Sequence, residues 1–197
     1  MESKEEFLEF AISKFLRYGS KRFTLDDLSH EIGISKKTIY QHFTNKEALV
    51  YESLGFLLDK IKAEVTQSVE QVRSNPILGI TMIYKIGLEY LKLFSPTFLE
   101  GIKKYYPKVN EQYHNFKNRE INGLVLSLLK TAQKNGQIRQ NVNVELSCQL
   151  YLNHLESLLF QSNNLFDQYS NRELLENLII NYIRGIATDS HLVMELS

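Results

Sequence analysis

The sequence predicts an all-α protein of about nine helices, and two observations support that fold class. Apolar residues recur at intervals of three and four positions, as in Leu8, Ala11 and Phe15, which is the period of one face of an amphipathic helix. Sustained alternation of apolar and polar residues, the pattern of a half-buried strand, is absent. A chain of 197 residues, 43% of them hydrophobic, is long and apolar enough to bury a core.

Capping signals set the expected ends of the helices. Thr24 followed by Asp27, and Thr44 followed by Glu47, have the capping-box spacing that satisfies free backbone N–H groups in a first helical turn. Ser95 precedes a proline, which suits the first position of a helix. We expect helices over residues 3–18, 25–31, 35–42, 45–73, 76–94, 96–105, 108–134, 143–161 and 171–194.

The lengths of these helices predict two domains. Three short helices precede a set of long ones, and the first long helix begins directly after Thr44. We therefore expect a small N-terminal domain over residues 1–47 and a helical bundle over residues 48–197.

Residues 32–43, IGISKKTIYQHF, place basic and polar side chains on a short helix with apolar anchors. If one helix starts after Thr24 and the next after Ser35, the connection between them is short and contains Gly33, which is the arrangement of a helix-turn-helix motif. Glycine suits this turn because it adopts positive φ without a steric cost. The residues expected to fill the wedge between the two helices are Leu28, Ile32, Ile34, Ile39 and Phe43.

The side chains left to face outward suit the major groove of DNA. Lysines and amides bind base edges, whereas hydroxyl groups bind phosphate. The net charge of the whole chain is zero, but residues 14–46 contain seven basic residues against three acidic ones. This local excess would attract the DNA backbone. The outward-facing residues are Lys36, Lys37, Thr38, Tyr40, Gln41 and His42.

The stretch FTLDDLSHEIGISKKTIYQHFTNKEALV, residues 23–50, resembles the DNA-binding domain of the TetR family of bacterial transcriptional regulators. The preceding AISKFLRYGSKRFTL resembles the family's first helix and turn, and NGQIRQNVNVELS and LIINYIRGIAT resemble segments of its last two helices. The resemblance implies an all-α homodimer whose N-terminal helix-turn-helix domains bind a palindromic operator on double-stranded DNA. It also implies a C-terminal bundle for dimerisation and regulation, in which a small-molecule effector releases the DNA.

The same resemblance assigns DNA contacts position by position. It matches Tyr40 and Lys46 to phosphate contacts, and it matches several positions of the recognition helix to base contacts. Thr24 and Ser35 are expected to cap helices as well. A solvated helix face or local packing explains the same side chains without DNA. The expected DNA-binding residues are Thr24, Ser35, Lys36, Lys37, Thr38, Tyr40, Gln41, His42 and Lys46.

Two further sites are expected in the C-terminal bundle. Aromatic residues on its central helices suit the lining of a cavity for an apolar or aromatic effector, although core packing explains the same spacing. Apolar stripes on the last two helices either pack internally or form a four-helix bundle between subunits. The expected pocket residues are Tyr84, Tyr90, Phe94, Phe98, Tyr105, Tyr106, Tyr113 and Phe116. The expected dimer residues are Leu155, Leu158, Leu159, Leu178, Ile179, Tyr182, Gly185 and Ile186.

Other functional classes have less support. The sequence contains no G-x-S-x-G, no glycine-rich phosphate loop, no C-x-x-C and no H-E-x-x-H, so we expect no catalysis, no metal and no cofactor. A helical protein-interaction module that has lost DNA binding is the alternative, and salt-dependent DNA affinity would separate the two. The single cysteine, Cys148, an N-terminus without secretory character and the absence of a long apolar stretch predict a cytoplasmic protein without a membrane partner.

Overall fold

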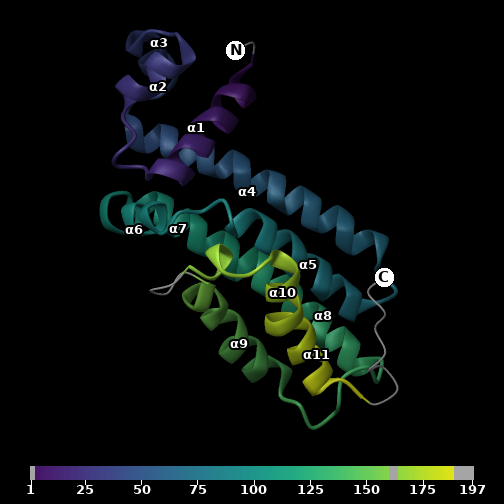
Figure 1. The fold of residues 1–197 in the computed structure, drawn as a ribbon. Helices are drawn as coiled ribbons and strands as arrows, with labels where there is room; N and C mark the ends of the chain where they lie inside the picture. The colour runs from purple at the N-terminus through teal and green to yellow at the C-terminus, as the bar shows by residue number, and fades with distance from the viewer. Residues whose placement is uncertain (1–2, 160–163, 189–197) are drawn as a thin grey trace. The chain divides into compact units, whose positions relative to one another are not determined.

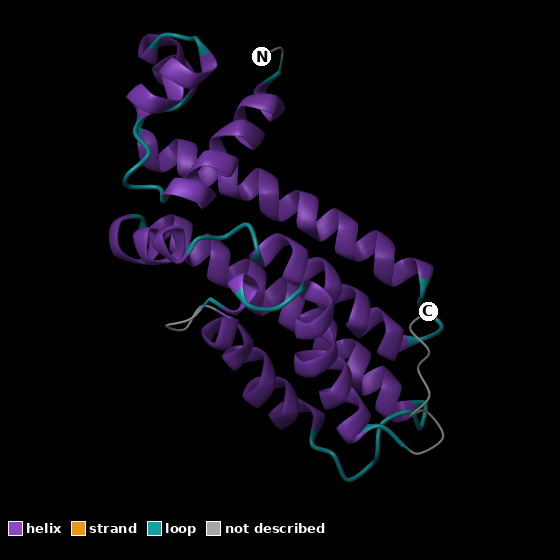
Figure 2. Ribbon diagram, viewed as in Figure 1, coloured by secondary structure: helices purple, strands orange, loops and turns teal. Residues whose placement is uncertain are grey.

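A computed structural model describes residues 3–159 and 164–188, which form helices and loops without a named strand (Figure 1, Figure 2). The helices are α1 (Lys4–Tyr18), α2 (Leu25–Ile32), α3 (Lys36–His42), α4 (Lys46–Gln71), α5 (Pro76–Leu91), α6 (Pro96–Tyr105), α7 (Pro107–Asn115), α8 (Asn122–Lys134), α9 (Val144–Leu159), α10 (Asn171–Leu175) and α11 (Asn181–Ile186). The π-helical segments η1 (Phe116–Ile121) and η3 (Glu176–Ile180) join α7 to α8 and α10 to α11, and η2 (Leu165–Asp167) is a short 3-10 turn.

The expected all-α fold is confirmed. Because η1 and η3 make two pairs of α-helices continuous, the described residues contain nine uninterrupted helices besides the turn η2. Each begins within one residue of its expected start. Within the described part of the chain, no helix is long and apolar enough to cross a membrane.

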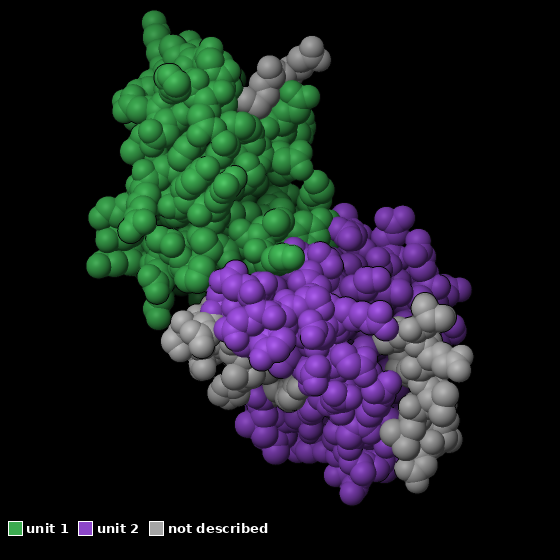
Figure 3. Space-filling model, in the orientation of Figure 1, with its two compact units in different colours: residues 1–62, 90–117 green, residues 63–89, 118–197 purple. Residues whose placement is uncertain are grey.

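The chain divides into two compact units, drawn in green and purple in Figure 3. Unit 1 comprises Met1–Lys62 and Tyr90–Lys117, and unit 2 comprises Ala63–Glu89 and Asn118–Ser197. The division places α6 and α7 with the N-terminal helices, because the long helix α4 leaves unit 1 and the chain returns to it after α5. The functional boundary between residues 47 and 48 stays a prediction.

In unit 1, α1 lies between α2–α3 at one end and α6–α7 at the other (Figure 1). Two hydrogen bonds hold the end of α1 and the turn after it against the two ends of α6. The backbone N–H of Ser95 donates to the carbonyl oxygen of Leu16 at 3.1 Å, and the Tyr106 hydroxyl donates to that of Ser20 at 3.4 Å. Gly19 has a φ of 85°, and a Cβ atom there would lie 3.2 Å from Thr97 Cγ2. α1 buries Leu8, Ala11, Ile12, Phe15 and Leu16.

In unit 2, the chain segment between α8 and α9 closes the end of the last helix. Ile138 and Ala187 form an isolated antiparallel bridge, and the N–H of Thr188 donates to the carbonyl oxygen of Gln137 at 3.0 Å. Ala187 is extended, with φ −68° and ψ 158°. The helix expected over residues 171–194 therefore ends at Ile186, because these backbone groups find partners outside the helix. The part of that prediction beyond residue 188 lies outside the described residues.

Candidate nucleic-acid interface

A capping box fixes the start of α2. The Thr24 backbone N–H and its hydroxyl both donate to Asp27 Oδ2 at 2.7 Å, and the Asp27 N–H donates to Thr24 Oγ1 at 3.2 Å. These hydrogen bonds from Thr24 lower the pKa of the Asp27 carboxyl group. The expected cap is confirmed, and the Thr24 hydroxyl is engaged in it as donor and acceptor.

The turn between α2 and α3 has the geometry expected from its glycine. Gly33 adopts a left-handed conformation, with φ 76° and ψ 28°, and its N–H donates to the carbonyl oxygen of Ser29 at 3.0 Å. Ser35 then caps α3 by accepting the Thr38 N–H at 3.1 Å. Its hydroxyl also lies 2.9 Å from the Thr38 hydroxyl, so both side chains take part in local hydrogen bonds.

Three of the five expected wedge residues anchor the motif. Leu28 is 0%, Ile39 1% and Phe43 4% exposed, and the Phe43 ring stacks on Phe7 of α1 with centroids 5.6 Å apart. The other two, Ile32 and Ile34, are half-buried and line an open groove of about 300 Å³ beside α1. The buried contact between α2 and α3 therefore contains fewer residues than predicted, since Ile32 and Ile34 line a surface groove instead.

The outer face of α3 carries most of the expected recognition residues. Lys36, Lys37, Gln41 and His42 are exposed, and Tyr40 is 53% exposed. Thr38 differs from these because it is half-buried and faces the groove beside α1. His42 is exposed but lines the same groove as Thr38. The outer face of α3 therefore carries four of the predicted residues, namely Lys36, Lys37, Tyr40 and Gln41.

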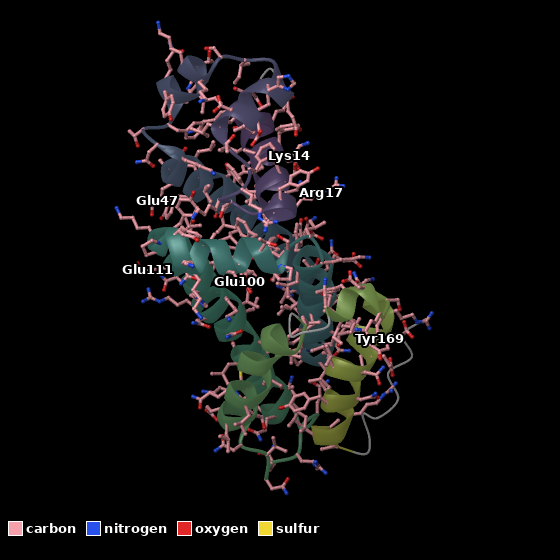
Figure 4. The ribbon with its side chains drawn as sticks, turned by 60° about the vertical axis from the view of Figure 1, so that its left-hand side comes forward. Lys14, Arg17, Glu47, Glu100, Glu111 and Tyr169 are labelled. Carbon is pink, nitrogen blue, oxygen red and sulfur yellow. The ribbon has the colours of Figure 1, made fainter. Side chains whose placement is uncertain are left out.

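The cations near this face are unequally available. Lys36 pairs with Asp26 in the first turn of α2, and Lys14 pairs with Glu31 at the end of the same helix. Lys14 and Arg17 project from α1 in Figure 4. By contrast, Lys37 has no acidic side chain within ion-pair distance in the described part of the chain.

Lys46 has a structural contact in addition to its expected role. Its Nζ donates to the carbonyl oxygen of Lys21 at 3.2 Å and lies 6.0 Å from the centre of the Phe15 ring. Burial lowers the pKa of the Lys46 ammonium group, and the charge of Asp27 opposes that shift. The side chain therefore links the start of α4 to the turn after α1, a link that a sequence separation of 25 residues does not reveal.

Lys21 and Arg22 contribute to the local positive charge but are not among the predicted site residues. Both are exposed on the turn before α2. The Lys21 ammonium lies 3.9 Å from the centre of the Tyr105 ring, whereas Arg22 has no ionic partner within the described residues. Their position next to the cap residue Thr24 is a signal that could have identified Arg22 as a candidate phosphate contact.

The eight residues predicted to line an aromatic pocket lie in different environments, and their role in binding an effector stays a prediction. Phe94, Phe98 and Tyr113 form a buried ring cluster in unit 1, with the Phe94 ring 5.7 Å from each of the other two. Tyr105 is on the surface beside Lys21, and Tyr106 binds the backbone of Ser20. Tyr90 and Phe116 are half-buried in unit 1, and Tyr84 belongs to unit 2.

Unit 2 contains a small cavity of about 10 Å³, room for roughly one water molecule. Burial raises the pKa of Tyr182 there, while a hydrogen bond with Ser147 acts in the opposite direction. Burial also raises the pKa of the Cys148 thiol, which makes the thiolate less accessible. Tyr84 is the one predicted pocket residue in the lining, which comprises Ile80, Tyr84, Val125, Leu129, Ser147, Cys148, Ile179, Tyr182 and Ile183.

The predicted dimer residues occupy different environments. Leu155, Leu159 and Ile179 are buried within the single chain, so they belong to its core. Leu178, Tyr182 and Ile186 are half-buried, Gly185 is exposed, and the side chain of Leu158 lies outside the described residues. Two further leucines, Leu146 and Leu150, are not among the predicted dimer residues. They lie one helical turn apart on α9 and are 49% and 59% exposed.

Comparison with known proteins agrees with this geometry. The sequence profile described as "Bacterial regulatory proteins, tetR family" matches residues 3–52, which contain α1, α2 and α3. The chain is 26% identical over 171 residues to an uncharacterised HTH-type transcriptional regulator, YvaF, of Bacillus subtilis, covering 85% of this chain and 87% of the relative. It is also 26% identical over 148 residues to the HTH-type transcriptional repressor KstR2 of Rhodococcus jostii, covering 73% and 72%.

Solved structures share the fold over nearly the whole chain. The ketosteroid transcriptional regulator KstR2 of Mycobacterium tuberculosis has a TM-score of 0.69 at 17% identity, covering 96% of this chain and 97% of that one. The transcriptional regulator FadR of Bacillus subtilis, solved in complex with stearoyl-CoA, has a TM-score of 0.70 at 13% identity, covering 93% and 100%. The helix-turn-helix geometry and the profile match together show that residues 3–52 match the TetR family of bacterial regulatory proteins, and the related sequences extend the similarity over most of the chain.

Proposed function

We propose that the chain is a ligand-responsive repressor that binds a palindromic operator as a homodimer and leaves it when a small-molecule effector binds. The observation that carries this proposal is α3, a capped and anchored helix that follows a left-handed turn and keeps Lys37, Tyr40 and Gln41 exposed. An exposed helix of this composition suits the major groove. The name of the Rhodococcus relative, a transcriptional repressor, supports repression as the outcome of binding.

Within this proposal, the exposed residues of α3 divide the work of recognition. Lys37 and Gln41 bind base edges, because an ammonium group suits guanine acceptors and an amide suits adenine. The hydroxyl of Tyr40 and the ammonium of Lys46 bind phosphate, and Arg22 adds a further phosphate contact. Thr24 and Ser35 act first as caps, because their hydroxyl groups are already engaged in the structure.

We place the effector in unit 2, at the cavity between α5, α8, α9 and the helix formed by α10, η3 and α11. Its described lining is mainly aliphatic with two tyrosines, which suits an apolar or aromatic molecule. The titles of two fold relatives name a ketosteroid regulator and a stearoyl-CoA complex, and both suggest a largely apolar effector. At about 10 Å³ the cavity has to widen to admit one. The π-helical segment η3, which contributes Ile179, is a natural place for such movement because π-helical segments often occur at functional sites.

We propose that the dimer forms through α9 and the last helix, with Leu146 and Leu150 at its centre. Two leucines this exposed on adjacent turns are typical of a surface that another chain covers. In this proposal the protein acts in the cytoplasm, by binding rather than catalysis.

In vitro selection from random duplex DNA, at near-physiological salt to suppress non-specific phosphate binding, tests the proposal. We expect enrichment of a two-fold symmetric motif with two half-sites about one helical turn apart or a multiple of it. A sample refolded from denaturant serves as control, since it has lost any effector that co-purified. If neither sample enriches a motif, the helix-turn-helix has no sequence-specific DNA function, and the alternative of a protein-interaction module replaces this proposal.

A further inference from the structure

The ion pair between Lys36 and Asp26 joins the two helices of the DNA-binding motif to each other. Asp26 lies in the first turn of α2, and Lys36 is the first residue of α3. Both side chains are accessible, with relative exposures of 70% and 45%. The pair is therefore at the surface where the recognition helix meets DNA, and it engages the first cation of that helix before any DNA is present.

A carboxylate and a phosphate are both oxyanions that bind an ammonium group. When Lys36 binds Asp26, it cannot make its full contact with DNA, so DNA has to displace the carboxylate. Lys37, directly beside it, has no such internal partner in the described part of the chain. Lys36 therefore has to lose an ion pair before it can bind DNA, whereas Lys37 does not.

The pair also affects the dependence of binding on salt. Binding releases the cations condensed on DNA, because lysines and arginines neutralise its phosphates. When DNA takes Lys36 from Asp26, the freed carboxylate attracts a cation of its own, so the net release is smaller. Breaking the pair in the free protein would make Lys36 behave as an ordinary phosphate-neutralising cation. The affinity would then rise at low salt and fall more steeply as salt increases.

We propose that Asp26 is an internal competitor for DNA, which weakens operator binding by holding Lys36 in an ion pair that DNA must break. The proposal rests on the DNA-binding function proposed above and adds the regulation of its strength. A family member that must leave its operator when the effector binds gains from such a competitor, because a moderate affinity is easier to overcome.

The test measures DNA binding of the full chain by fluorescence anisotropy at about 50 to 200 mM salt. The probes are a labelled random-sequence duplex and the duplex from the selection. We expect Asp26→Asn to raise the affinity up to about fivefold at low salt and to steepen the slope of log affinity against log salt by up to about one. In the Lys36→Gln background, Asp26→Asn should have only the small effect of Asp59→Asn, a matched charge removal at an exposed position of α4.

The double-mutant comparison separates a competitor from simple repulsion of DNA by Asp26. An equal gain from Asp26→Asn with and without Lys36 would overturn the proposal, because the carboxylate would then act on DNA directly. No gain in either background would overturn it as well. These two outcomes leave the proposed function intact if the unmodified chain binds DNA. Failure of the unmodified chain to bind either duplex at low salt would instead reject both proposals.

Discussion

Several of the residues proposed to contact DNA also hold the fold together. Thr24 caps α2 through Asp27, Ser35 caps α3 through Thr38, and Lys46 binds the carbonyl oxygen of Lys21. A cap contributes about 1 kcal/mol without any partner molecule. Loss of DNA binding in a variant of one of these residues therefore shows a DNA contact only if the stability of the variant is measured too.

Lys46 allows the two roles to be separated. We expect Lys46→Met, which keeps most of the side-chain volume, to lower the free energy of unfolding by about 1 kcal/mol, because one hydrogen bond to Lys21 is lost. We also expect it to weaken DNA binding on all sequences and to make the salt dependence shallower by about one unit of slope. Urea unfolding and binding titrations at several salt concentrations measure the two effects.

Gln41→Ala is the matched control for Lys46→Met. Its side chain is exposed and takes no part in the caps, so the variant should keep its stability and change base preference instead. If Lys46→Met loses stability but keeps the wild-type salt slope, its ammonium group supports the turn after α1 and does not bind phosphate.

At the scale of single residues, the sequence was informative about side-chain types and local spacing. It identified the caps at Thr24 and Ser35, because a cap and its backbone partner lie within three residues. It did not reveal the pairs between Lys36 and Asp26 or between Lys46 and the Lys21 carbonyl. Those pairs depend on how two elements pack, which no local pattern specifies.

At the scale of elements, the turn between α2 and α3 determines the angle at which α3 is presented. Gly33 has a φ of 76°, and a Cβ atom added there would meet nothing within 4 Å. A substitution therefore acts through backbone conformation alone. Substitutions of Gly33 therefore measure how much the left-handed turn contributes to stability, without a steric clash.

We expect Gly33→Ala to lower the free energy of unfolding by about 1 kcal/mol, because a Cβ atom disfavours the left-handed region. Gly33→Asn should cost less, because asparagine tolerates that region. Gly123→Ala is the control, since Gly123 is exposed in α8 with equal space around it and should gain about 0.5 kcal/mol or more from better helix propensity. Urea unfolding followed by circular dichroism measures all three. A Gly33→Ala variant as stable as the wild type would show that the turn adapts to a side chain.

Helix existence was easier to predict than helix ends. The spacing of apolar residues by three and four positions and the cap signals placed all nine expected helices within the described residues. The cap predicted at Thr44 was one residue early, because Asn45 Oδ1 accepts the N–H of Ala48 at 2.8 Å. The end of the last helix was wrong because its termination depends on the bridge between Ile138 and Ala187, which are far apart in sequence. The π-helical segments were missed for a similar reason, since they retain the composition of ordinary helices.

At the scale of the molecule, the sequence could not show how the aromatic residues are distributed. Phe94, Phe98 and Tyr113 pack on one another in unit 1, whereas Tyr84 lies in the lining of the unit 2 cavity. Their helical spacing is the same in both cases, because a core and a pocket use the same apolar faces. Whether an aromatic residue belongs to unit 1 or to unit 2 depends on tertiary structure, which helical spacing does not specify.

An apolar stripe on a helix is likewise explained either by packing within the chain or by packing against a second chain. In α9, the exposure of Leu150 makes it the residue with which to test the dimer. We expect Leu150→Glu to weaken self-association more than about tenfold, because a charge would be buried without a partner in the contact. Leu93→Glu is the control, since Leu93 is 55% exposed against 59% for Leu150 but lies between α5 and α6. Analytical ultracentrifugation over a range of protein concentrations measures the self-association of both variants. Binding to the selected palindrome should weaken only for Leu150→Glu, because tight binding to two half-sites needs two linked DNA-binding domains. A Leu150→Glu variant that sediments as a stable dimer would place the contact on another face, whereas a wild-type chain that is monomeric at all concentrations would remove the dimer from the proposed mechanism.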